Sequence, residues 1–248
     1  MSDAGPSQGA HLLRERQRVA PLRGHHASTA VFITGTDTGV GKTVFGRALL
    51  RSQVARGHRA VGMKPVASGI APGATANADV LALAAAGNVD APLAMRNPYA
   101  FAAAIAPHLA AEAAGVVIEL ERIRRSFDEL ALRADRIVVE GAGGALAPLG
   151  RRHDMLDIAL ALGIPVVLVV GMRLGCLNHA LLSALAIRAR GLRFLGWVAN
   201  GIDPGYEALA ANVAALEQRL PAPRLASLTW LDQESAQWTT EASALDLA

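Results

Sequence analysis

A glycine-rich segment that ends in a lysine and a threonine carries the clearest chemistry in this sequence. It reads Gly35-Thr-Asp-Thr-Gly-Val-Gly-Lys-Thr43. Backbone N–H groups in such a loop converge on phosphate oxygens, and a helix that begins at its end adds the positive end of its dipole. We expect Lys42 to reach the β- and γ-phosphates of a nucleotide and the Thr43 hydroxyl to coordinate Mg²⁺. The strict pattern has its first glycine where this chain has Thr36, and Gly35 stands one position earlier.

A chance glycine-rich turn before a helix is the alternative explanation of this segment. The apolar run before it predicts a strand and the pattern after it predicts a helix, and this context favours a nucleotide site. The ATP-binding residues that we predict within the segment and just after it are Gly39, Val40, Gly41, Lys42, Thr43 and Val44.

Short β-rich runs alternate with helix-like stretches from about residue 31 onward. We predict strands over residues 31–34, 60–66, 136–140, 165–170 and 195–199. We predict helices over residues 42–56, 107–114, 119–134, 177–190 and 206–219, and one capped by Asn77 and ended by Gly87. This alternation indicates an α/β fold of the P-loop NTPase type, a single domain with a mainly parallel sheet and helices on both faces.

The positions of these elements also predict the limits of the folded part. Residues 29–232 form the predicted domain, residues 1–28 a disordered leader, and residues 233–248 a loose tail or a docked helix. In a parallel sheet, ligands bind outside the carboxyl ends of the strands. Lys64 and Glu140 stand at or near the ends of predicted strands, and Asn200 directly follows one, so we expect all three at the same edge as the glycine-rich segment.

Composition narrows the class of protein. The 248 residues carry a formal net charge of +3, and residues 1–30, with four arginines and two acidic residues, account for +2 of it. A nearly neutral body argues against nucleic acid as a partner. No run of 18 apolar residues is present, and the one cysteine, Cys176, cannot form an intramolecular disulfide. We therefore expect a cytoplasmic protein that binds neither nucleic acid nor membrane.

Four further segments resemble one enzyme family in both content and order. They are Lys64-Pro-Val-Ala-Ser-Gly69, Asn97-Pro-Tyr-Ala-Phe101, Val139-Glu-Gly-Ala-Gly-Gly144 and Leu174-Gly-Cys-Leu-Asn-His179. Together with the glycine-rich segment they are similar to the dethiobiotin synthetases of biotin synthesis, over roughly residues 31–232. The resemblance implies a cyclo-ligase that joins CO₂ to 7,8-diaminopelargonate with ATP and Mg²⁺, through a carbamate and a carbamic-phosphoric anhydride. The products are dethiobiotin, ADP and phosphate.

The resemblance also implies roles for particular residues. Lys64 and Lys42 are the catalytic residues, with Lys64 holding the carbamate and the γ-phosphate. Asp79 and Glu140 join Thr43 as the metal ligands. The ATP site extends over Asp79, Glu140, Gly141, Ala142, Gly143 and Asn200, the last at the position that reads adenine.

The family resemblance places the substrate between two subunits of a homodimer. Ser68 contacts the substrate, and the helix start at residues 175–179, contributed by the partner subunit, binds its carboxylate. Gly175, Cys176 and Asn178 are the substrate-binding residues of that segment, although Cys176 is expected to pack rather than react. Asp37 would orient metal-bound water, and His108 has either a functional or a purely structural role.

Other functions of the same fold stay open at this point. A nucleotide-driven switch of the partitioning or cell-division type is the main alternative, but such proteins carry an extra lysine where this chain has Thr36 and Asp37. A GTPase requires a lysine in the segment that here reads Asn200-Gly-Ile-Asp203. Amidating synthetases of cofactor assembly usually need a glutaminase domain, for which the chain has no room.

Overall fold

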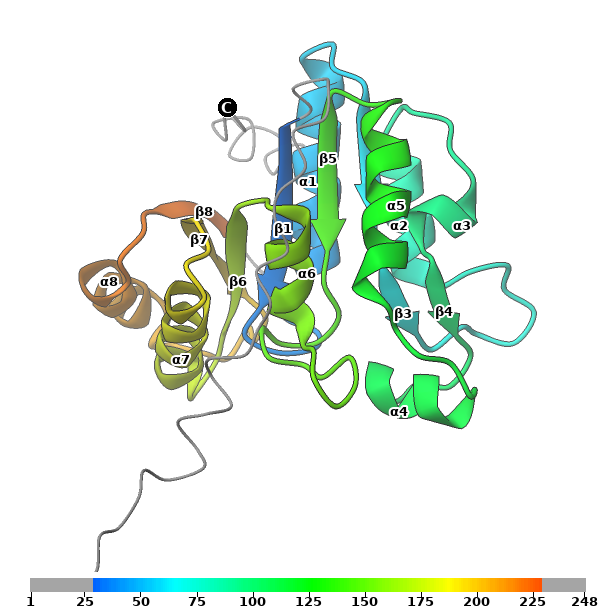
Figure 1. The fold of residues 1–248 in the computed structure, drawn as a ribbon. Coiled ribbons are helices and arrows are strands. Elements are labelled where there is room, and N and C mark those ends of the chain that lie inside the picture. The colour runs from blue at the N-terminus through cyan, green and yellow to red at the C-terminus, as the bar shows by residue number, and fades with distance from the viewer. Residues whose placement is uncertain (1–28, 229–248) are drawn as a thin grey trace, which may run out of the picture.

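A computed structural model describes residues 29–228, and one six-stranded sheet with the order β2-β5-β1-β6-β7-β8 forms its centre (Figure 1). Every pairing within this sheet is parallel. Its strands are β1 (Thr29–Gly35), β2 (Ala60–Met63), β5 (Arg136–Glu140), β6 (Val166–Met172), β7 (Phe194–Gly201) and β8 (Arg224–Leu228). The predicted fold class is therefore confirmed. The predicted leader, the whole of the predicted tail and residues 229–232 of the predicted domain lie outside the described residues.

Helices cover the sheet on both sides (Figure 1). They are α1 (Lys42–Ala55), α2 (Ala78–Ala86), α3 (Leu93–Arg96), α4 (Pro107–Ala113), α5 (Leu120–Ala131), α6 (Met155–Leu162), α7 (Cys176–Ala189) and α8 (Leu209–Arg219). Figure 1 shows α5, α6 and α7 in front of the sheet and α1 and α2 behind it. No helix within residues 29–228 is long and apolar enough to span a membrane.

The two-residue period of the strands divides the core between these layers. Along β1, Val31 and Ile33 belong to the cluster that includes Phe45 and Leu49 of α1, whereas Phe32 packs in the cluster on the opposite face. Both faces of β1 are covered by other parts of the protein. Residues on both faces are therefore apolar, and the strand has an unbroken apolar run. β1 is thereby buried at the centre of the sheet, where its carboxyl end holds the glycine-rich loop.

The predicted strand over residues 60–66 is wrong in one respect, because the structure divides it. β2 ends at Met63, and β3 (Val66–Ser68) pairs with β4 (Tyr99–Phe101) in a separate two-stranded sheet. Pro65 separates the two strands, and proline has no N–H to donate to a strand ladder. The chain therefore leaves the main sheet at Lys64.

Several elements were absent from the sequence prediction, namely α3, β4, α6 and β8. α6 begins with a capping box. The Asp154 side chain accepts hydrogen bonds from the backbone N–H groups of Leu156 and Asp157, and the Asp157 side chain accepts one from the Asp154 N–H. The predicted helix over residues 206–219 begins later, at Leu209, because Asp203 accepts hydrogen bonds from the backbone N–H groups of Gly205 and Tyr206 in a turn. The other predicted helices and strands agree with the structure to within a few residues.

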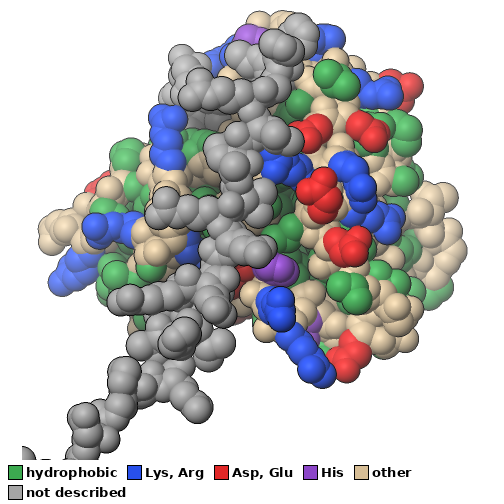
Figure 2. Space-filling view, in the orientation of Figure 1, with side chains coloured by type: hydrophobic (Ala, Val, Ile, Leu, Met, Phe, Trp, Pro, Cys, Tyr) green, Lys and Arg blue, Asp and Glu red, His purple; other side chains and the backbone are tan. Residues whose placement is uncertain are grey.

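Positively and negatively charged side chains are mixed on the face of the molecule drawn in Figure 2. Figure 2 shows acidic and basic side chains interspersed over the side of the molecule that carries α5. A basic stripe of the kind that binds nucleic acid would instead gather one sign of charge on one face.

Candidate nucleotide-binding active site

A cleft of about 880 Å³ opens at the carboxyl edge of the main sheet. It is lined by residues from the loops after β1, β2, β5 and β7 and by the segment before α4. The lining residues used below are Thr38, Gly39, Gly41, Lys42, Thr43, Val44, Lys64, Ser68, Asp79, Glu140, Ala142, Gly143 and Asn200. The parallel strands thus bring together residues that lie as far as 162 positions apart in the chain, as expected for a ligand site in such a sheet.

The glycine-rich loop joins β1 to α1 with two residues in the left-handed region, Gly39 at φ 73° and Gly41 at φ 91°. Asn200 fixes this conformation, because its Nδ2 donates a hydrogen bond of 2.8 Å to the backbone oxygen of Val40. A Cβ atom on Gly41 would lie 2.0 Å from Asn200 Nδ2. The close approach of Asn200 therefore requires glycine at position 41. The residue that the family resemblance assigns to adenine recognition also holds the phosphate loop.

Lys42 lies inside the loop with 6% of its surface exposed. Its Nζ donates a hydrogen bond of 2.8 Å to the backbone oxygen of Asp37. Burial, together with the positive charge of Lys64, lowers the pKa of Lys42 to about 8. A polyanion such as a triphosphate stabilises the ammonium form of a lysine, so this side chain suits a phosphate ligand.

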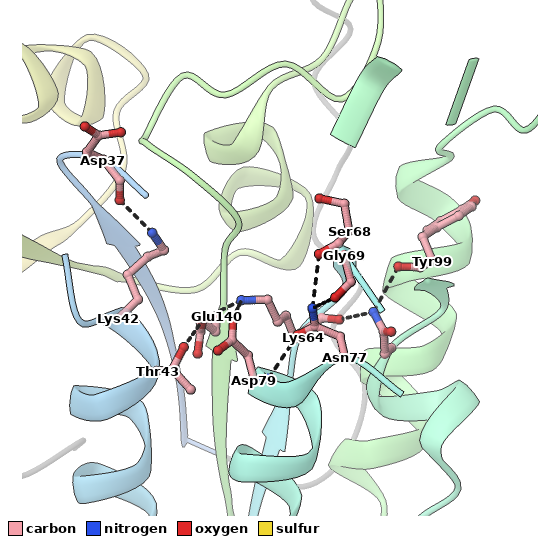
Figure 3. Close-up of polar contacts among 11 residues, drawn as sticks. Asp37, Lys42, Thr43, Lys64, Ser68, Gly69, Asn77, Asp79, Tyr99 and Glu140 are labelled. Atoms are coloured by element: carbon pink, nitrogen blue, oxygen red, sulfur yellow. Dashed lines mark hydrogen bonds and ion pairs between the residues drawn. The ribbon is translucent and has the colours of Figure 1, made fainter. Parts of the chain in front are cut away.

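Lys64 lies between two carboxylates at the end of β2 (Figure 3). Its Nζ is 2.5 Å from Glu140 Oε1 and 2.8 Å from Asp79 Oδ2. Burial acts to lower the pKa of Lys64, but the charges of Glu140 and Asp79 outweigh it and raise that pKa above its usual value. Lys64 is therefore an ammonium ion at neutral pH, held with 5% of its surface exposed.

The two carboxylates reach this point from different elements. Glu140 is the last residue of β5 and is fully buried. Asp79 lies in the first turn of α2, where Asn77 caps the helix by accepting a hydrogen bond from the Asp79 N–H. Asn77 also donates to the backbone oxygens of Ser68 and Gly69 (Figure 3). The N-cap thus fixes α2, and with it Asp79, against the segment that follows β3.

Thr43 completes a group of oxygen atoms that fits Mg²⁺. Its Oγ1 donates a hydrogen bond of 2.8 Å to Glu140 Oε1. Glu140 Oε2 is buried and has no hydrogen-bond partner among residues 29–228. A hydroxyl and two carboxylates are the oxygen ligands that Mg²⁺ takes alongside phosphate oxygens. Among residues 29–228, no group of three or more His, Cys, Asp or Glu side chains is arranged to hold a metal ion.

Ser68 lines the same cleft, although its hydroxyl donates to the backbone oxygen of Ile105 at 2.7 Å. His108 is not part of the cleft lining, and its Nδ1 atom is buried without a hydrogen-bond partner. Gly175, Cys176 and Asn178 also lie outside this cleft. Cys176 is buried, whereas Gly175 and Asn178 are exposed. Within one chain, the start of α7 therefore does not line the cleft.

Some residues of the site were missed in the sequence prediction. Arg173, just after β6, forms an ion pair of 2.6 Å with Asp37 of the loop. Ala104, Ile105 and Ala106 also line the cleft. No local pattern marks these apolar residues, because their placement depends on the β3–β4 pair that the sequence prediction lacked.

Comparison with known proteins agrees with this geometry. A protein-family model described as an AAA domain matches residues 29–237. The ATP-dependent dethiobiotin synthetase BioD of Xanthomonas axonopodis pv. citri is 49% identical over 220 residues, which cover 88% of this chain and 97% of that protein. The BioD protein of Nitrosospira multiformis is 50% identical over 217 residues, which cover 88% of this chain and 94% of its own.

Solved structures with the same fold include proteins of other functions. The MinD cell division protein of Aquifex aeolicus has a TM-score of 0.55 at 15% identity, with 87% of this chain and 94% of that chain covered. A plasmid partition protein of Borrelia burgdorferi has a TM-score of 0.58 at 11% identity, with 90% of this chain and 98% of that chain covered. At such low identity these similarities speak for the fold alone. With about half of its residues shared across nearly the whole length of the BioD proteins, the chain belongs to the ATP-dependent dethiobiotin synthetase family.

Proposed function

We propose that this protein is a dethiobiotin synthase that closes the cyclic urea of dethiobiotin from 7,8-diaminopelargonate, CO₂ and ATP. Family membership supports the reaction. The observation that carries the residue roles is the buried Lys64 ammonium, held by Asp79 and Glu140 beside the phosphate loop. Such a cation can neutralise the charge that moves between a carbamate and a γ-phosphate.

The chemistry requires positioning and charge neutralisation rather than a protein nucleophile. One amine of the substrate adds to CO₂, loses a proton and becomes a carbamate. A carbamate oxygen then attacks the γ-phosphorus and ADP leaves, which gives a mixed anhydride. The second amine attacks the carbonyl carbon and loses a proton, the ring closes, and the phosphorylated carbamate oxygen leaves as part of phosphate. Holding the reactants in place can contribute about 7–11 kcal/mol to such a step.

Each part of the cleft has a place in this proposal. Lys42 and the backbone N–H groups of the loop bind the β- and γ-phosphates. Lys64 faces the carbamate and the γ-phosphate, and Ser68 lies where its hydroxyl can meet the substrate. Asn200 and the residues after Glu140, namely Gly141, Ala142 and Gly143, complete the ATP site.

Thr43, Asp79 and Glu140 would hold Mg²⁺ in this proposal. The bound ion would neutralise charge on the β- and γ-phosphate oxygens. The fit is supported by the buried Glu140 Oε2, which has no hydrogen-bond partner among residues 29–228, and by the hydrogen bond from Thr43 to Glu140.

We further propose that the protein acts as a homodimer in the cytoplasm. Gly175 and Asn178 are exposed and do not line the cleft of their own chain, so in this proposal they serve the cleft of a second copy. The N–H groups at the start of α7, a helix of 14 residues, would then face the substrate carboxylate of the partner's cleft.

A switch ATPase is the second candidate, because MinD and the partition protein share the fold. A product assay separates the two functions. Purified protein is incubated with 7,8-diaminopelargonate, bicarbonate, Mg²⁺ and ATP, and the products are measured by mass spectrometry. We expect dethiobiotin and ADP in equal amounts, and neither product when the diamine is omitted. ATP hydrolysis that responds to DNA or lipid but not to the diamine would contradict the proposal.

A further inference from the structure

The backbone of Lys64 lies just beyond the end of a strand ladder. The last pair between β2 and β5 is Met63 with Val139, so Lys64 has no partner strand of its own. Pro65 follows and directs the chain into β3. A buried N–H and a buried carbonyl at such a break need other partners, because an unpaired buried backbone group loses its hydrogen bonds to water without replacement.

Residues 96 and 97 supply both partners. The Lys64 N–H donates to the backbone oxygen of Arg96 at 2.8 Å. The Asn97 side chain donates through Nδ2 to the Lys64 carbonyl at 2.6 Å and to the Tyr99 carbonyl at 2.9 Å. Asn97 is 6% exposed, so water does not compete for these bonds.

The Arg96 side chain anchors this segment in turn. Its guanidinium is buried and donates to the backbone oxygens of Gly62, Val89 and Ala91. Gly62 belongs to β2, and the other two residues lie in the loop after α2, the helix that carries Asp79. The segment at residues 96–97 therefore contacts the elements that supply Lys64 and Asp79 to the site.

We propose that Asn97 is a positioning residue, whose side-chain amide sets the backbone of Lys64 and thereby places its ammonium between Asp79 and Glu140. This rests on the proposed role of Lys64 in catalysis. The Lys64 side chain starts from a backbone that no strand restrains, and a displacement of about 1 Å in a reacting group can lower a rate by about 100-fold. Asn97 needs no contact with substrate for this effect.

The sequence offers a direct readout of Lys64. Lys42 and Lys64 are the only lysines among the 248 residues. Full-length protein labelled with ¹³C-lysine thus has two lysine side-chain signals, which Lys42→Met and Lys64→Met variants assign. We expect Asn97→Ala, and the equally shaped Asn97→Asp that lacks the donor, to shift the Lys64 signal and leave the Lys42 signal in place.

Asn88 provides a matched control at the other end of β2. Its side chain donates to the His58 carbonyl at 3.0 Å and accepts from the Ala60 N–H at 2.8 Å, away from the cleft. Asn88→Ala removes the same number of side-chain-to-backbone bonds, so we expect it to leave both lysine signals unchanged. An unmoved Lys64 signal in Asn97→Ala, or an equal shift in Asn88→Ala, overturns the proposal.

Kinetics test the consequence for catalysis. We expect Asn97→Ala to lower kcat for dethiobiotin formation by about 10- to 100-fold with the KM for ATP unchanged. In a Lys64→Ala background the same substitution should cause no further loss, because it acts through Lys64. An equal loss in both backgrounds overturns the proposal. If Asn97→Ala does not fold, Asn97→Asp is compared with Asn88→Ala in the same two measurements, with the same expected results. The lysine signals can be measured without turnover. Wild-type protein that forms no dethiobiotin would therefore contradict the proposed function, while the positioning of Lys64 by Asn97 could still be tested by these signals.

Discussion

At the scale of single residues, the site depends on one ammonium group shared by two carboxylates. Lys64 contacts Asp79 and Glu140, and Glu140 is fully buried. A buried carboxylate is costly unless a cation or a metal compensates its charge. Lys64 therefore has a structural task as well as its proposed catalytic one, and a variant must be tested for both.

Replacing Lys64 tests the proposed catalytic task. We expect Lys64→Ala to lower kcat by about 10²–10³-fold, the range seen when a preorganised group that stabilises transition-state charge is removed. ATP binding should weaken far less, because the loop and Lys42 hold the phosphates independently. Steady-state rates of dethiobiotin formation and calorimetric ATP titrations measure the two effects.

The structural task of Lys64 sets the control for that experiment. Denaturant unfolding of the variant must show that it is folded at the assay temperature, because breaking a buried ion pair costs about 3–5 kcal/mol. Near-normal turnover by a folded Lys64→Ala protein would remove Lys64 from the catalytic residues.

At the scale of elements, the phosphate loop is held by a residue from another strand. Asn200 of β7 bonds to the Val40 carbonyl and lies against Gly41. We expect Gly41→Ala to displace the loop and abolish measurable ATP binding, because the new Cβ would overlap Asn200 and because φ is 91°. Titration with ATP and thermal unfolding with and without ATP measure the effect.

Gly57 is the matched control for this substitution. It has φ 84°, and a Cβ atom added to it would have no other atom within 4 Å. Gly57→Ala should cost about 1–2 kcal/mol of unfolding free energy for the left-handed backbone alone and leave ATP binding intact. Equal losses of ATP binding in the two variants would show that backbone strain, and not the contact with Asn200, decides the result.

A second element-scale feature joins the starts of β2 and β5. Arg59 donates to Asp135 from its backbone N–H at 3.0 Å and from Nη2 at 2.8 Å. These hydrogen bonds lower the pKa of Asp135 from 3.8 to about 2. A carboxyl whose pKa is lower in the folded state adds stability above the unfolded pKa and loses it as pH falls toward the folded pKa.

The stabilisation by Asp135 should therefore be present at pH 6 and decline between about pH 4 and pH 2. We expect Asp135→Asn to be less stable than the wild type at pH 6, with a smaller difference at pH 3. Urea unfolding at both pH values measures the free energies. A difference that grows as the pH falls would contradict this assignment.

At the scale of the whole molecule, one face of α7 has no partner within the described chain. Leu182 is 56% and Leu185 61% exposed, and both follow Asn178 at helical spacing. Leu182 and Leu185 lie beside Asn178, which we expect to serve the active site of a second copy. Exposed leucines at this place suit the interface of the proposed homodimer.

We expect Leu185→Asp to weaken dimer formation by about 2 kcal/mol or more, the range for a central interface residue. Dethiobiotin formation should fall with the dimer, whereas ATP binding to each chain should persist. Sedimentation at several concentrations measures the association. Leu132→Asp, at a leucine that is 69% exposed at the end of α5, is the control and should change neither property. Full activity of a monomeric Leu185→Asp protein would contradict a site shared between subunits.

The sequence alone determined the fold class and much of the candidate site. Strand and helix patterns are local, and parallel strands all end at the same edge, so the positions of Lys42, Lys64 and Glu140 in the chain already predicted that they meet. The family resemblance added Asp79, which the cap at Asn77 places in the first turn of α2. The predicted positions agree with the structure because they depend on spacing within single segments, whereas the roles of these residues stay predictions.

Only the tertiary structure decided how the expected residues meet. β2 pairs with β5 rather than with its chain neighbour β1, and this pairing puts Lys64 beside Glu140. The bonds from Asn97 to Lys64 and from Asn200 to Val40 span 33 and 160 residues. Contacts over such separations arise from packing and strand order, which leave no periodic trace in the sequence, and so the residues that hold the site became visible only in the folded molecule.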